Sequence, residues 1–155
     1  GKYFRSWVTD LDRDRFEVFA YYTGHVKDGF SGKFAAAVEH YRHILDIPTR
    51  VADAVLADRR DVLVYPDVGM DTASYLLAGM RLAPVQCAGW GHPVTTGQGN
   101  MDYFLTCGEM EPPDAHRGRL HRANGQLPAL DALRDEIHFS AILHPPAVPA
   151  RCQGT

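Results

Sequence analysis

An α/β fold built on an open parallel sheet is what the sequence predicts, and three observations lead to it. Short segments rich in β-branched and aromatic residues alternate with helical segments, the pattern of parallel strands joined by crossover helices. The segment 61–66 is an almost continuous apolar run, typical of a strand buried on both faces. The length of 155 residues suits one domain with a hydrophobic core of its own.

Each element is assigned from its residues, in chain order. We expect helices at 2–9, 33–40, 49–57 and 73–80, and strands at 16–22, 41–45, 61–66, 84–90 and 101–106. The strand at 16–22 ends at the turn signal Thr23-Gly24, and the Ala-rich composition predicts the helix at 33–40. Thr49 and Asp71 stand where helices begin and are candidate N-caps.

The character of the sequence changes from Ala115 onward. Residues 116–122 are basic and without a regular period, 127–137 could form a short helix, and 144–150 are Pro-rich. We therefore expect a partial domain over 1–114 and a divergent, poorly ordered tail over 115–155. A frameshifted reading frame would account for the change.

Composition and charge exclude several classes of function. The chain is 45% hydrophobic and 23% charged, with a net charge of −3, so no general attraction to nucleic acid or to an anionic membrane is expected. Its longest apolar runs are too short to span a bilayer. Cys87, Cys107 and Cys152 are widely spaced and lack metal or redox spacing, so we expect reduced thiols in a cytoplasmic protein.

The densest unusual segment is Gly89–Gly97, which directly follows the strand at 84–90. Its glycines allow close backbone approach to a ligand, and its Thr hydroxyls and backbone N–H groups could hold a phosphate or a sugar. His92 could accept or donate a proton. The spacing matches no phosphate-loop motif, and a strand-to-helix turn with a capping histidine explains the pattern equally well.

Two further sets of polar residues are candidates. Asp67 and Asp71 follow the strand at 61–66, and loops in this position carry function in parallel sheets. Asp71 is more simply a helix N-cap, whereas Asp67 is a better candidate for ligand contact. Glu39, His40 and His43 could suggest a metal site, but solvated or capping histidines are favoured and we expect no metal.

Several motifs in order resemble one enzyme family. They are D-V-L-V-Y-P-D-V-G-M-D at 61–71, R-L-A-P-V-Q-C-A-G-W-G-H-P-V-T-T-G at 81–97 and M-D-Y-F-L-T at 101–106, with W-V-T-D-L-D-R-D-R-F-E-V-F-A-Y-Y-T-G at 7–24. Together they resemble bacterial, SPINDLY-like members of the O-GlcNAc transferase family, which often carry tetratricopeptide repeats. The resemblance covers about residues 1–114.

The resemblance implies the Rossmann-like, acceptor-side N-terminal half of a GT-B glycosyltransferase, in incomplete form. It further implies inverting transfer of N-acetylglucosamine, or a related hexose, from a UDP-sugar to a polypeptide hydroxyl, without a cofactor or metal. The implied catalytic residues are His92 and Asp67. The implied substrate-binding residues are Gly91, Pro93, Thr95, Thr96, Gly97, Gly69 and Asp71.

Two parts of the family's structure lie outside the resemblance, and each leads to an expectation. The donor domain of the family, which grips the UDP, has no counterpart in the chain, so we expect negligible transferase activity from the chain alone. The family's first strand has no counterpart either, so we expect exposed sheet backbone and self-association. A non-enzymatic α/β binding or interaction domain remains the alternative. A flavodoxin-like nucleotide-binding enzyme fits less well, because no phosphate-loop fingerprint is present.

Overall fold

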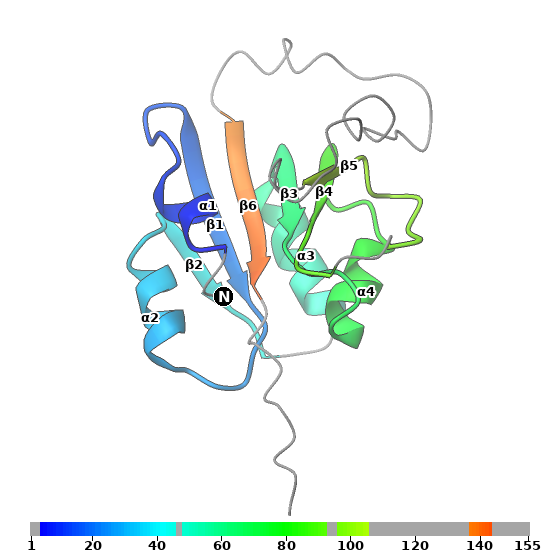
Figure 1. Cartoon of the computed structure of the whole chain (residues 1–155), viewed down its shortest axis with the longest axis horizontal. Helices are drawn as coiled ribbons and strands as arrows, with labels where there is room; N and C mark the ends of the chain where they lie inside the picture. The colour runs from blue at the N-terminus through cyan, green and yellow to red at the C-terminus, as the bar shows by residue number, and fades with distance from the viewer. Residues whose placement is uncertain (1–3, 46–47, 93–95, 106–136, 144–155) are drawn as a thin grey trace, which may run out of the picture.

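The computed structural model describes residues 4–45, 48–92, 96–105 and 137–143. The elements are α1 (Ser6–Thr9), β1 (Phe16–Tyr22), α2 (Gly29–Ala35), β2 (His40–His43), α3 (Pro48–Asp58), β3 (Val62–Tyr65), α4 (Thr72–Ala78), β4 (Val85–Gly89), β5 (Tyr103–Leu105) and β6 (Ile137–Leu143). They form one six-stranded sheet in the order β2-β1-β6-β3-β4-β5 (Figure 1). Every pairing between neighbouring strands is parallel, which confirms the predicted α/β class.

The five strands predicted in the first 106 residues are all present, with small shifts at their ends. The helix predicted at 33–40 was placed too late, since α2 spans Gly29–Ala35. The reason is a reciprocal cap: Ser31 N–H donates to Asp28 Oδ1 at 2.9 Å, and Asp28 N–H donates to Ser31 Oγ at 3.0 Å. The chain then joins the sheet at His40, one residue before the predicted strand.

Of the two N-caps predicted from the sequence, Asp71 is confirmed and Thr49 is wrong. Thr49 is not an N-cap, because α3 already includes Pro48, whose fixed φ and missing N–H suit a first helical position. Asp71 is the N-cap of α4, as predicted, and its Oδ1 accepts a hydrogen bond from Ser74 N–H at 2.8 Å. Helix α4 is therefore fixed in place directly after the loop that follows β3.

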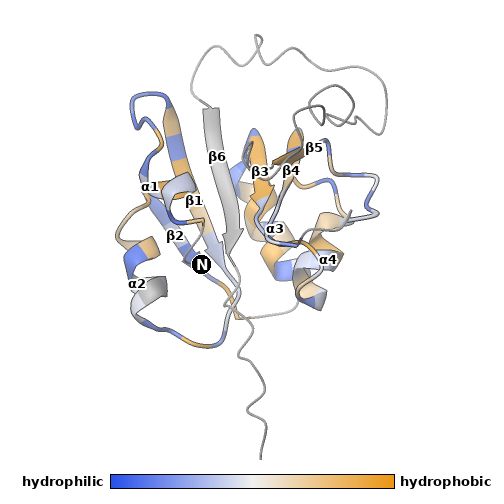
Figure 2. Ribbon diagram, in the orientation of Figure 1, coloured by the Kyte–Doolittle hydropathy of each residue, from blue (hydrophilic) through white to orange (hydrophobic). Residues whose placement is uncertain are grey.

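The two faces of β1 pack into different cores, because successive side chains of a strand point to opposite faces. Phe19 and Tyr21 belong to the larger core, which also contains buried side chains from α3, β3 and α4. Val18, Ala20 and Tyr22 belong to a smaller core with α1 and α2. Strands β3 and β4 are among the most hydrophobic segments of the molecule (Figure 2). Helices therefore cover the sheet from both sides.

Strand β6 was not predicted from the sequence. It lies at the centre of the sheet, paired with β1 over Phe16–Tyr22 and with β3 over Val62–Val64. The proposed domain boundary at residue 114, the predicted helix at 127–137 except its last residue, and the Pro-rich segment 144–150 lie outside the described residues. None of the helices in the described part of the chain has the length and apolar character needed to cross a bilayer.

Candidate functional site at the carboxyl end of the sheet

The candidate site lies where parallel strands end together. Because β3 and β4 are paired in parallel, the loops after Tyr65 and after Gly89 emerge side by side at the carboxyl end of the sheet. These two loops carry Asp67 and His92, and both residues are half-buried. The topology thus brings together the two residues that the sequence placed first among the candidates.

Direct backbone contact joins the two loops at Gly91. Its N–H donates to the carbonyl oxygen of Pro66 at 3.0 Å. A Cβ at Gly91 would lie 2.5 Å from that oxygen and 2.8 Å from the Cβ of Asp67. Nonbonded atoms do not approach so closely, so only glycine at position 91 lets the two loops lie this near to each other. The absence of a side chain at Gly91 thus sets how Asp67 is placed relative to His92.

The His92 ring packs against Gly69 in the neighbouring loop. Gly69 has a φ of 101°, a backbone conformation that side chains disfavour. A Cβ added there would lie 3.1 Å from His92 Cδ2 and 3.5 Å from Nε2. Because glycine has no Cβ, one edge of the imidazole can lie against the backbone of Gly69, while His92 stays half-buried.

The remaining predicted site residues divide into three groups. Asp71 uses one carboxylate oxygen as the N-cap of α4, so it has a structural role at the edge of the site. Thr96 accepts a hydrogen bond from Gln98 N–H at 3.2 Å, and Gly97 has a φ of 65°. Pro93 and Thr95 lie outside the described residues.

An aromatic cluster beside the His92 loop was not predicted from the sequence. The Phe4 ring lies 4.9 Å from the Trp7 ring and 5.1 Å from the Trp90 ring, between centroids. Phe4 is buried, whereas both tryptophans are half-buried. Its Cε2 atom would also touch a Cβ at Gly91, at 3.0 Å. The N-terminal segment thus supports the loop that carries His92, and the aromatic residues Phe4, Trp7 and Trp90 are the sequence signal that could have suggested this contact.

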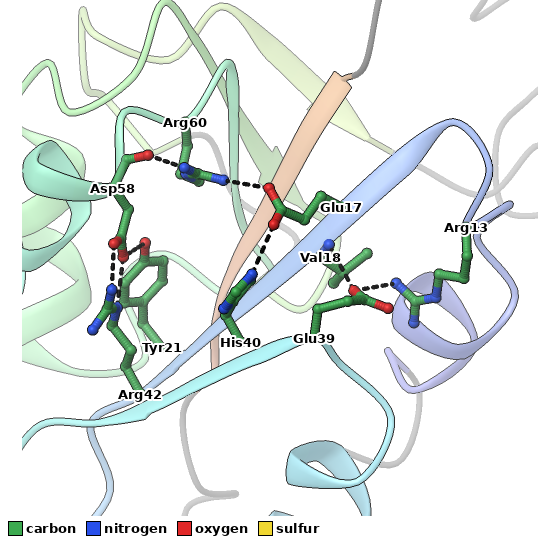
Figure 3. Close-up of polar contacts among 9 residues, drawn as sticks. All are labelled: Arg13, Glu17, Val18, Tyr21, Glu39, His40, Arg42, Asp58 and Arg60. Carbon is green, nitrogen blue, oxygen red and sulfur yellow. Dashed lines mark hydrogen bonds and ion pairs between the residues drawn. The ribbon is translucent and has the colours of Figure 1, made fainter.

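The residues considered for a metal site are engaged elsewhere and point apart. His40 Nε2 lies 2.7 Å from Glu17 Oε1, whereas Glu39 accepts hydrogen bonds from Arg13 Nη1 at 3.3 Å and from a backbone N–H of β1 (Figure 3). His43 Nε2 contacts the carbonyl oxygen of Gly24 at 2.8 Å. Within the described segments, no group of three or more His, Cys, Asp or Glu side chains is arranged to hold a metal ion.

These features define a class of protein: an α/β domain with a Rossmann-like parallel sheet, whose candidate site carries Gly91, His92 and Asp67 at the carboxyl end of the sheet. No protein-family model matches the chain. The chain is 32% identical over 99 residues to the UDP-N-acetylglucosamine–peptide N-acetylglucosaminyltransferase of Caenorhabditis elegans. That alignment covers 61% of this chain and 8% of the relative.

A solved structure shows a similar fold. A point mutant of the Thermobaculum terrenum O-GlcNAc transferase superposes with a TM-score of 0.57 at 17% identity, over 78% of this chain and 31% of that one. The chain is therefore similar to O-GlcNAc transferases in sequence, and its fold matches part of the GT-B Rossmann-like architecture. It spans under a third of the length of either protein.

Proposed function

We propose that the chain forms the acceptor-side half of a glycosyltransferase, which transfers N-acetylglucosamine or a related hexose from a UDP-sugar to a hydroxyl of a polypeptide. One observation carries the proposal: the loops of Asp67 and His92 are held in contact at the carboxyl end of a parallel sheet. Similarity to peptide N-acetylglucosaminyltransferase in sequence supports it as well. The protein would act in the cytoplasm, within a longer chain that supplies the donor domain.

The chemistry of transfer explains why these residues suit the site. In an inverting reaction the acceptor hydroxyl attacks the anomeric carbon and loses its proton, while the UDP oxygen leaves with the bonding electrons. His92 can accept that proton or hold the hydroxyl, since an imidazole nitrogen can act as a base or as a hydrogen-bond partner. Asp67 lies on the neighbouring loop, where its carboxylate can orient the acceptor or stabilise a protonated His92.

Transfer also requires groups that we assign to the donor domain. A leaving diphosphate needs positive charge or helix N-termini opposite it, and donor and acceptor must be held at near-attack distance. We therefore expect the chain alone to bind an acceptor peptide weakly and to give negligible turnover with UDP-N-acetylglucosamine. Measurable product from the chain alone, detected by mass spectrometry of the peptide, would overturn this division of roles.

Binding can be tested separately from turnover. Titrating a Ser/Thr-rich peptide or N-acetylglucosamine into the ¹⁵N-labelled chain should shift the backbone amide signals of Gly69, Gly91 and His92. The His92→Ala variant should reduce the shifts of Gly69 and Gly91 at least threefold, whereas Asp53→Asn, on the exposed side of α3, should leave them unchanged. Shifts confined to α2 or α3 would refute the assignment of the site.

Glycine variants can test whether the contact between Gly69 and the His92 ring matters for ligand binding. Gly69 and Gly97 both have positive φ, so alanine strains the backbone at either position. Only the Cβ at Gly69 would meet the His92 ring, since a Cβ at Gly97 has nothing within 4 Å. Gly97 is itself an implied substrate-binding residue, so Gly97→Ala compares backbone strain only, and Gly99→Ala, where a Cβ has nothing within 4 Å, is the neutral control. Gly69→Ala should weaken ligand binding more than either, and an effect no larger than that of Gly99→Ala would refute a role for the Gly69–His92 contact.

A further inference from the structure

The two halves of the sheet are joined by a strand from a distant part of the chain. Strands β2 and β1 form one half and β3, β4 and β5 form the other, and β6 is the strand between them. It pairs with β1 along all seven of its residues and with β3 along Phe139–Ala141. Without β6, the sheet would have a gap one strand wide between β1 and β3.

Contacts that do not involve β6 hold the walls of this gap in place. Arg60, just before β3, donates to Glu17 of β1 at 3.3 Å (Figure 3). Its guanidinium carbon also lies 3.7 Å from the centre of the Phe19 ring. The Tyr21 hydroxyl of β1 donates to Asp58, at the end of α3, at 2.6 Å. The larger core continues across both halves beneath these contacts. With β6 removed, the gap would therefore be a groove whose two walls of strand backbone are held by contacts of their own.

We propose that this groove binds residues 137–143 of a second copy of the chain in place of the chain's own β6, so that two copies exchange this strand. The pairings of β6 are parallel and involve backbone groups, so a strand from either copy satisfies them equally. The segment Ile-His-Phe-Ser-Ala-Ile-Leu carries no Asp, Glu, Lys or Arg, which suits a central strand in either molecule. The proposal rests on the fold alone and not on the transferase assignment.

Concentration decides which copy supplies the strand. Tethering gives a segment a local concentration of about 1 mM for a short linker and less for a longer one. The connection from Leu105 to Ile137 is long in sequence, so a second copy competes best when chains refold together at high concentration. Exchange should therefore appear as a dimer whose amount depends on the protein concentration during refolding.

The test uses a variant whose own β6 cannot pair. Ala141→Pro removes a backbone N–H at a position paired on both sides, with Ala20 and Val64, whereas Ala141→Gly keeps that N–H. A fluorescent synthetic peptide of residues 137–143 should bind the Pro variant at least tenfold more tightly than the unmodified chain or the Gly variant, measured by anisotropy. Equal binding to all three, or binding to none, would overturn the proposal.

Two further measurements complete the test. Refolding at high concentration should give dimers of the unmodified chain and not of the Pro variant, by size exclusion with light scattering. A chain that stays monomeric under all conditions would overturn strand exchange. Should the Pro variant not fold, added peptide should restore the hydrogen-exchange protection of β1 amides, and failure to restore it would also count against the groove.

Discussion

Replacing Gly91 by alanine tests the contact on which the candidate site depends. The new Cβ would lie 2.5 Å from the carbonyl oxygen of Pro66, 2.8 Å from the Cβ of Asp67 and 3.0 Å from the Phe4 ring. Two of these neighbours belong to or adjoin the backbone, so they cannot simply rotate away. The loops must separate, and the hydrogen bond from Gly91 N–H to Pro66 must lengthen or break.

The expected cost has two parts. Overpacking a well-fitted contact costs about 1–3 kcal/mol, and losing a hydrogen bond costs about 1 kcal/mol more. The free energy of unfolding should therefore fall by about 2–4 kcal/mol, which corresponds to a drop in Tm of roughly 5–15 °C for a chain of this size.

Thermal unfolding followed by circular dichroism measures this change. Gly99→Ala is the matched control, because a Cβ at Gly99 has nothing within 4 Å and its φ is not positive. Its Tm should stay the same or rise slightly, since alanine reduces the entropy of the unfolded chain. A Gly91→Ala variant that melts with the unmodified chain, or a control that falls equally far, would refute the reasoning.

Three other substitutions or treatments have defined outcomes. Asp71→Ala removes the N-cap of α4 and should lower the free energy of unfolding by about 1 kcal/mol in urea titrations, whereas Asp71→Ser should restore most of it. Burial tends to raise the pKa of Asp58, but hydrogen bonds from Arg42 and Tyr21 outweigh it and hold that pKa below its ordinary value. Its stabilising contribution is therefore complete above about pH 4 and is lost as the pH falls through the lowered pKa, so Asp58→Asn should cost about 1–2 kcal/mol at pH 7 and progressively less in acid. A constant cost from pH 7 to pH 2 would contradict this. Burial and the nearby acidic charge raise the pKa of the Cys87 thiol to about 12, so iodoacetamide at pH 8 should alkylate it only after denaturation, as peptide mass spectrometry can verify.

Apolar patterning was enough to predict most of the sheet. The segment 16–22 was predicted as a strand with the bounds that β1 has, and the buried run at 61–66 contains β3. These strands could be predicted because each segment contains the apolar residues that bury it, so the signal is local in the sequence. The start of α2 could not be read in this way, because it depends on the reciprocal cap between Asp28 and Ser31, which the Ala-rich composition of 33–37 concealed.

Long-range contacts account for what the sequence did not reveal. Parallel topology predicted that the Asp67 and His92 loops emerge at one end of the sheet, and the backbone contact between them agrees with that prediction. The roles of these two residues in catalysis stay predictions. The contact of Phe4 with Trp90 and the central place of β6 depend on segments far apart in the chain, and local patterns carry no information about them.

Packing of Phe4 between two indole rings has a practical consequence for spectroscopy. The chain contains two tryptophans, Trp7 and Trp90, and both belong to this cluster beside His92. Light at the red edge of the protein absorption band excites tryptophan selectively. The fluorescence that it produces therefore comes only from these two residues beside the candidate site. An unlabelled chain thus reports optically on events at that end of the sheet, whether a ligand arrives or the N-terminal segment detaches.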